Sequence, residues 1–263
     1  MTWCDLIILV TCDLFFRKNR ICLLYTFASE VRLLGCIFCV CLRVNPSQLY
    51  TCLNEKTIKE QHMDNTDNKR FSIFPTGWWD ETNLRVVPRQ HPQQTQTIEW
   101  VYEYIKSERA RRATLQLRAM DGKATREEKQ QFKLLNFEYA TFSGIFSYRN
   151  AKGLVMRSPY LTIDIDDLTS LQEAHRVREL LVRDTSITTA LCFVSPKGKG
   201  VKWIVELPEW TYGKNFREQY EMVRRYIGFN YGIDPDKSGS DVCRACFLPW
   251  DEECFINNKY FNQ

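Results

Sequence analysis

The seven residues from Tyr160 to Asp166 constrain the fold more than any other part of the chain. Apolar and polar residues alternate in the sequence Tyr-Leu-Thr-Ile-Asp-Ile-Asp, which is the period-two pattern of a β-strand with one apolar face. The carboxylates of Asp164 and Asp166 leave the opposite face roughly 7 Å apart along the strand. Two negative charges at this separation repel each other and raise the free energy, unless a cation neutralises them or one carboxyl stays protonated. Because hard oxygen ligands suit Mg²⁺ or Mn²⁺, the pattern predicts a metal-binding pair, with an ordinary solvated strand face as the alternative.

The segments after this strand indicate the fold class. Thr169 or Ser170 can cap a helix, with Glu173 placed to complete a capping box. The later apolar patterns predict a strand, a second strand, a helix and a last strand at residues 188–194, 201–207, 214–231 and 244–250. The order β-α-β-β-α-β is that of a ferredoxin-like sheet. We therefore predict an α+β fold in which residues 158–263 form a ferredoxin/RRM-like palm.

A smaller, basic α/β unit is predicted to precede the palm, at residues 63–157. It begins with a strand at Phe71–Phe74 and contains a helix at about residues 97–117, with Ile98, Val101 and Ile105 on its buried side. Lysines and arginines are frequent in this helix and after it. Such charges commonly form only a solvated helix face, but their density here also suits a phosphate backbone. The residues predicted to bind nucleic acid are Arg109, Arg111, Arg112, Arg118 and Lys123.

Residues 1–62 differ in composition from the rest, since they contain seven of the eleven cysteines. Cysteines without a regular spacing predict reduced thiols and a cytoplasmic location, not a disulfide framework. The apolar bursts are interrupted by charges and are too short to span a membrane, and Asp5 stands where a signal peptide carries positive charge. We therefore expect no membrane partner. We also expect residues 1–62 to be an extension that is not part of the fold, with translation starting at Met63.

Two further groups of residues are predicted to join the acidic pair. The connection Ser195-Pro-Lys-Gly-Lys-Gly200 can cradle phosphate with its backbone amides, with Lys202 as a cation at its exit. A plain hairpin is the alternative. Asp251 offers a third carboxylate at the end of the last strand, and two metal ions held by three such acids would clamp an in-line displacement. The residues predicted to bind the nucleotide are Ser195, Lys197, Gly198, Gly200, Lys202 and Arg244.

These motifs in this order resemble the archaeo-eukaryotic primase superfamily, which has a paired-acid motif, a serine-x-histidine motif and a final acid. Together with Phe71–Phe74 and Thr141-Phe-Ser-Gly144, they more closely resemble the VirE N-terminal domain family of bacterial mobile elements. The resemblance covers about residues 70–256. It implies that Asp164, Asp166 and Asp251 bind metal ions. Lys202 stands where many members have histidine, so its implied role is an electrostatic contact with the triphosphate.

The predicted function is that of a metal-dependent nucleotidyltransferase, a primase or primase-polymerase module. It would act with nucleoside triphosphates on single-stranded DNA, in replication or mobilisation of a mobile element. The alternative is a catalytically inactive primase-like module that binds nucleotide and DNA for a replication partner. The chain has no Gly-x4-Gly-Lys-Ser/Thr motif, so we expect any helicase to be a separate chain. Cys243-Arg-Ala-Cys246 with Cys254 is interpreted as buried cysteines, with a zinc site as the alternative.

Overall fold

The computed structural model describes residues 67–261, which belong to a unit that begins at Asp64. The predictions for residues 1–62 lie outside the described residues. The α+β class is confirmed. The α-helices are α4 Ile98–Lys106, α5 Arg111–Ala119, α6 Arg126–Asn136, α7 Leu171–Val182 and α8 Phe216–Tyr231. The strands are β1 Phe71–Phe74, β2 Trp78–Asp80, β3 Arg85–Val87, β4 Gln94–Gln96, β5 Tyr139–Thr141, β6 Gly144–Phe146, β7 Leu154–Arg157, β8 Tyr160–Ile165, β9 Thr189–Val194, β10 Val201–Glu206, β11 Cys246–Phe247 and β12 Phe255–Ile256. Short 3₁₀ helices are η2 Asp67–Lys69, η3 Glu108–Ala110, η4 Ala151–Gly153, η5 Glu209–Thr211, η6 Lys237–Ser240 and η7 Asn258–Tyr260. Within the described residues, every helix is too short or too polar to cross a membrane.

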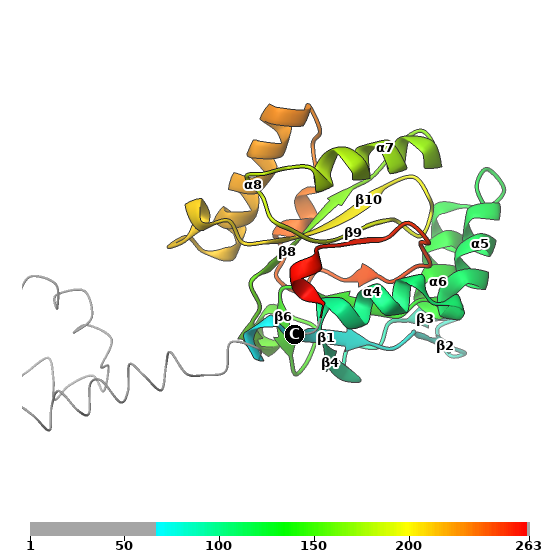
Figure 1. Cartoon of the computed structure of the whole chain (residues 1–263). Coiled ribbons are helices and arrows are strands. Elements are labelled where there is room, and N and C mark those ends of the chain that lie inside the picture. Colours follow the sequence, from blue (N-terminus) through cyan, green and yellow to red (C-terminus); the bar gives the residue numbers. More distant parts are fainter. Residues whose placement is uncertain (1–66, 262–263) are drawn as a thin grey trace, which may run out of the picture. The chain divides into compact units, whose positions relative to one another are not determined.

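The palm sheet has the order β12-β9-β10-β8, and each neighbouring pair is antiparallel. Period-two alternation sorts its side chains: Val201, Trp203 and Val205 of β10 face α7 and α8, together with the odd-numbered apolar residues of β8. Figure 1 shows these two helices on one side of the sheet. The opposite face of β10 carries Lys202 and Ile204. The same alternation that buries one face therefore delivers Asp164 and Lys202 to the other.

A second sheet, β11-β5-β1-β4, and helix α4 lie on that other side of the palm sheet. One apolar core connects the two sheets, because Phe71 of β1, Val101 of α4 and Phe193 of β9 belong to the same buried cluster. The side of the palm that carries Asp164 is thus covered by the first half of the unit, and Asp164 and Lys202 lie at a buried junction.

The predicted last strand belongs to a different sheet from the one expected. Its regular part is β11, which pairs with β5, Cys246 opposite Ala140. The palm sheet is completed instead by β12, whose Phe255 lies opposite Cys192 of β9. Because β11 comes from the predicted palm and β5 from the predicted preceding unit, the two predicted units share one sheet. This crossing decides where Asp251 lies.

The helix predicted at residues 97–117 is interrupted at Ser107. This residue has an extended backbone, ends α4, and accepts a hydrogen bond from the Arg109 amide with its hydroxyl, so it also caps η3. The chain then continues as α5. A serine competes with the helix for backbone hydrogen bonds, which is why apolar periodicity alone missed the break. The predicted buried residues of the first part are confirmed, with Ile98, Val101 and Ile105 all buried.

Candidate functional site

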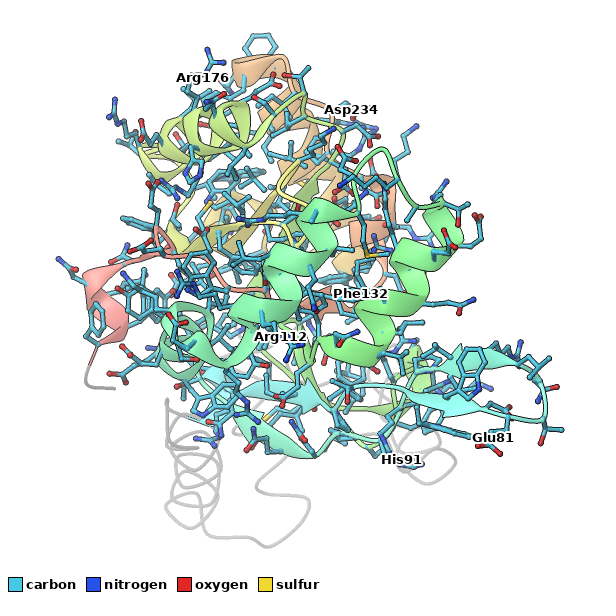
Figure 2. All side chains as sticks on the ribbon, turned by 90° about the vertical axis from the view of Figure 1, so that its right-hand side faces the viewer. Glu81, His91, Arg112, Phe132, Arg176 and Asp234 are labelled. Atoms are coloured by element: carbon cyan, nitrogen blue, oxygen red, sulfur yellow. The ribbon has the colours of Figure 1, made fainter. Side chains whose placement is uncertain are left out.

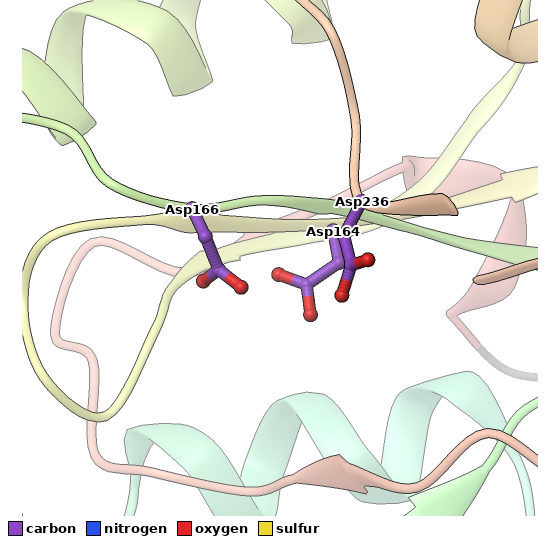
Figure 3. Close-up of side chains that lie close together, drawn as sticks. All are labelled: Asp164, Asp166 and Asp236. Atoms are coloured by element: carbon purple, nitrogen blue, oxygen red, sulfur yellow. The ribbon is translucent and has the colours of Figure 1, made fainter. Parts of the chain in front are cut away.

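Three aspartates meet on the inner face of the palm. Asp164 lies in β8, Asp166 follows directly after it, and Asp236 precedes η6. One carboxylate oxygen from each lies within 4.8 Å of the others, and Figure 3 shows the three side chains on one side of β8. Asp164 is only 4% exposed. We call these three residues the acid cluster.

Asp236 is placed by backbone contacts that no sequence pattern reveals. Its amide donates to the carbonyl of Asp164 at 2.8 Å, and the Tyr220 hydroxyl of α8 donates to its carbonyl at 2.5 Å. Its carboxylate caps η6 by accepting from the amide and hydroxyl of Ser238, at 3.0 and 2.5 Å. The sequence Asp234-Pro-Asp236 indicates a turn, but it does not say which strand the turn contacts.

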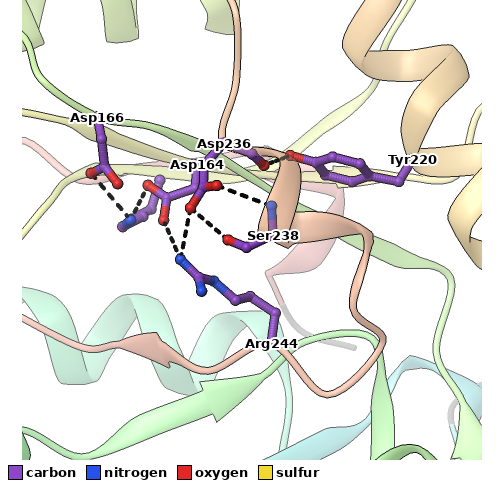
Figure 4. A network of polar contacts seen from close by, with 7 residues as sticks. Asp164, Asp166, Tyr220, Asp236, Ser238 and Arg244 are labelled. Atoms are coloured by element: carbon purple, nitrogen blue, oxygen red, sulfur yellow. Dashed lines mark hydrogen bonds and ion pairs between the residues drawn. The ribbon is translucent and has the colours of Figure 1, made fainter.

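Two cations lie against the acid cluster (Figure 4). Lys202 stands directly opposite Asp164 in the antiparallel pair of β10 and β8. Its ammonium forms an ion pair with Asp164 and lies 3.7 Å from Asp166. The Arg244 guanidinium lies 2.9 Å from Asp236 and 3.6 Å from Asp164. Three carboxylates therefore share two cations.

Burial shapes the protonation of this cluster. It raises the pKa of Asp164, and repulsion from Asp166 adds to the rise, against the opposing effect of Lys202. Burial alone would lower the pKa of Lys202, but Asp164 and Asp166 outweigh it and hold that pKa above its usual value. For Asp236, burial raises the pKa, yet the hydrogen bonds from Ser238 and the charge of Arg244 hold it below the ordinary value. Lys202 is thus a fixed positive charge inside the site.

The connection from Ser195 to Gly200 is a tight turn beside the acid cluster. The Ser195 amide donates to the Gly200 carbonyl and the Gly198 amide to the Ser195 carbonyl, both at 2.8 Å. These two amides are therefore not available to cradle phosphate, contrary to the prediction. Gly198 has a φ of +77°, which glycine adopts without strain. The Ser195 hydroxyl is buried and has no hydrogen-bond partner in the described part of the chain.

Gly200 has no room for a side chain. A Cβ there would lie 2.5 Å from the Ile165 carbonyl oxygen, 3.0 Å from a carboxylate oxygen of Asp166 and 3.1 Å from the Ser195 hydroxyl. The glycine lets β10 start against the end of β8. The hydroxyl and the carboxylate thus border the same small space.

The Gly200→Ala variant is expected to lose about 1–3 kcal/mol of unfolding free energy, because the added methyl overpacks this junction. The matched control is Gly228→Ala in α8, where a Cβ would meet only the Ile233 carbonyl oxygen at 3.7 Å. That variant should gain about 0.5–1 kcal/mol from the better helix residue. Urea midpoints at unchanged slope measure both; equal stability of Gly200→Ala and wild type would contradict the crowding.

Asp251, predicted as the third metal ligand, is not part of the acid cluster. Its carboxylate accepts from the Val194 amide at 2.7 Å and from the Glu253 amide at 3.1 Å, and it faces the buried Arg178 of α7 at 4.0 Å. Arg178 also binds Glu253 at 2.7 Å. Asp251 lies in the connection from β11 to β12, and its hydrogen bond from Val194 holds that connection against β9.

The basic residues predicted to bind nucleic acid do not share one environment. Arg109 is paired with Glu138 at 2.9 Å, and Arg111 with Glu108 at 3.0 Å. Arg112 and Lys123 are exposed, and Figure 2 labels Arg112, which belongs to α5. Arg118, in contrast, is half-buried and packs on the turn, since a Cβ on Gly198 would lie 3.3 Å from its Nε.

Other predicted nucleotide-binding residues surround the acid cluster to different extents. Lys197 is exposed on the turn, whereas Lys202 and Arg244 contact the aspartates directly. Sequence reasoning missed Lys133 of α6, whose charge interacts with those of Lys197, Lys202, Asp164 and Asp166. Its place in a run of basic residues gave no reason to single it out. The cysteines that the structure describes are buried and unpaired: Cys192, Cys243, Cys246 and Cys254.

The fold and the site define an α+β unit with an acid cluster and basic side chains at the junction of two sheets. A protein family described as BT4734-like, N-terminal domain, matches residues 134–255, somewhat under half of the chain. The match contains the acid cluster, the turn and Arg244. No curated protein and no solved structure matches the chain. This family name differs from that of the VirE family, so the resemblance to primases stays a prediction.

The donor set suits a hard divalent cation. Three carboxylates supply only oxygen atoms, which Mg²⁺ and Mn²⁺ prefer, and their separation allows one ion to be shared. Asp164, Asp166 and Asp236 would hold it. The ammonium of Lys202 occupies part of the same region, so a bound ion would have to share or replace its contact with Asp164.

Proposed function

We propose that this protein is a metal-dependent nucleotidyltransferase of the primase or primase-polymerase type, acting with nucleoside triphosphates on single-stranded DNA. The observation that carries the proposal is the acid cluster, three carboxylates within 4.8 Å bordered by basic side chains. Carboxylates that hold Mg²⁺ or Mn²⁺ beside cations are the arrangement that phosphoryl-group transfer requires. The sequence resemblance to primases supports the same class.

The chemistry assigns each group a role. The reaction class joins a hydroxyl oxygen to the α-phosphorus and breaks the bond from that phosphorus to the bridging oxygen, so pyrophosphate leaves. A divalent cation bound by the acid cluster would acidify the attacking hydroxyl and neutralise charge on the phosphate. Lys202 and Arg244 hold the cluster together and offer positive charge to the phosphates. Arg112 and Lys123, both exposed, are available to the template backbone.

The Asp236→Asn variant tests the ligand that sequence patterns did not predict. Asparagine keeps the cap of η6 but offers a neutral oxygen, so Mn²⁺ affinity should fall at least about tenfold. Asp234→Asn is the matched control, since Asp234 is exposed and pairs with Arg224 instead of the acid cluster. Calorimetric titration with Mn²⁺ measures both variants. Equal affinity in wild type and Asp236→Asn would remove Asp236 from the site.

The proposed activity itself is tested with wild-type protein, Mn²⁺, nucleoside triphosphates and a single-stranded DNA template. Labelled product of discrete lengths and released pyrophosphate are the expected result. Absence of product under conditions where metal and nucleotide bind would refute catalysis.

One observation favours the second candidate, an inactive module that binds nucleotide and DNA for a replication partner. Lys202 already neutralises Asp164, so the cluster can persist in the fold without a metal ion. Calorimetry separates the two candidates: nucleotide binding that depends on metal, without any product from the same sample, identifies the binding module.

A further inference from the structure

Two partly buried cations near the site, Lys133 and Arg118, form no ion pair in the described part of the chain, in contrast to Lys202 and Arg244. Carboxylates act on them only from farther away: Asp164 and Asp166 on the charge of Lys133, and Asp251 on that of Arg118. The Lys133 ammonium lies 5.4 Å from the centre of the Phe247 ring. The Arg118 Nε is buried and has no hydrogen-bond partner. Buried charges are normally paired, so both side chains point to an anionic ligand.

The two cations come from helices that face the turn at residues 195–200. Arg118 of α5 packs against Gly198, and Lys133 of α6 is close enough to Lys197 and Lys202 to be influenced by their charges. Burial, with those neighbouring lysines, lowers the pKa of Lys133 to about 8. Such crowding of positive charge is unfavourable by itself, and an anion with several negative charges would relieve it.

The turn supplies the opposite wall of this space. The Ser195 hydroxyl is 2% exposed and unpartnered, and it borders the space next to Gly200 that Asp166 also borders. An ion pair between Lys199 and Asp121, at 2.7 Å, ties the turn to the connection between α5 and α6. A buried hydroxyl without a protein partner needs a hydrogen bond from outside the chain, and a phosphate oxygen would supply one.

We infer that Lys133 and Arg118 bind the outer phosphates of the nucleotide, between α5–α6 and the turn, so that the site selects ligands by the number of linked phosphates. This inference rests on the proposed function, because it takes the acid cluster as the place of the inner phosphate. Linked phosphates spread their charge over several oxygens, which suits separate cations and a hydroxyl donor. A monophosphate would reach too few of them.

The inference is tested without metal, by titrating the full chain with tripolyphosphate, pyrophosphate and inorganic phosphate. Tripolyphosphate should bind most tightly. Lys133→Met and Arg118→Met should each weaken it about tenfold or more, as expected for the loss of a charged hydrogen bond. Arg126→Met on α6 and Arg176→Met on α7 remove the same charge at exposed positions outside the proposed site and should leave the affinity unchanged. Lys133→Arg should keep it, which separates lost charge from lost folding.

The outcomes separate this inference from the proposed function. Unchanged tripolyphosphate affinity in both site variants, or equal losses in the two controls, would overturn the inference. Equal affinity of wild type for tripolyphosphate and inorganic phosphate would also overturn it. Mn²⁺-dependent product formation with an unaltered KM for nucleotide in Lys133→Met would refute the role of Lys133 and leave the transferase proposal intact.

Discussion

Asp164→Asn is expected to lower Mn²⁺ affinity by more than about 100-fold, the upper end of the effect for residues that only support a ligand, and to abolish product formation. The reason is that Asp164 is the most buried of the three acids and contacts both Lys202 and Arg244. Asparagine keeps the shape but removes the charge. Calorimetry with Mn²⁺ and a primer-synthesis assay measure the two effects.

Controls for this variant separate binding from folding. Asp167→Asn changes the neighbouring exposed aspartate, whose φ of 60° asparagine also tolerates, and it should bind Mn²⁺ as wild type does. The double variant Asp164→Asn/Lys202→Met removes the buried pair as a whole, which is often neutral for stability. It should melt like wild type and still fail to bind metal. Mn²⁺ binding by this double variant would contradict the acid-cluster site.

Asp251→Ala is expected to cost about 1–3 kcal/mol of unfolding free energy, the range for a buried hydrogen-bonding group that is left without its partner. The alanine would leave the Val194 amide unsatisfied and Arg178 with Glu253 alone. Because domains of this kind have only about 5–15 kcal/mol in total, the effect would show directly in chemical unfolding curves.

The conservative variant Asp251→Asn distinguishes a fastening role from metal binding. Asparagine still accepts from the Val194 amide, so it should fold, with a smaller loss of stability, and bind Mn²⁺ as wild type does. A folded Asp251→Asn protein without Mn²⁺ affinity would restore the metal role that its position after the last predicted strand suggested.

The parts of the site that lie in regular strands could be predicted from sequence. The alternation of apolar and polar residues in β8 predicts that Asp164 and its polar neighbours lie on one face of the sheet. The alternation in β10 predicts that Lys202 lies on the face opposite the apolar side chains of that strand. Antiparallel pairing then placed Lys202 opposite Asp164. Period-two patterns determine such positions because successive side chains point to opposite faces.

The remaining parts depended on long-range contacts. Asp236 joins the cluster through a backbone hydrogen bond to β8, and nothing in a turn sequence specifies which strand it will touch. A strand pattern likewise does not say which sheet the strand enters, so β11 was assigned to the palm and Asp251 to its surface. The Ser107 break depended on a local cap competing with an apolar stripe.

The passage of the chain from β11 in one sheet to β12 in the other has a wider consequence. Neither half can move far from the other without breaking the pairing of β11 with β5 or of β12 with β9. The two halves that border the site are therefore held in a fixed arrangement. Substitutions in the first half, even those remote from the aspartates, are therefore expected to have accumulated together with compensating changes in the second.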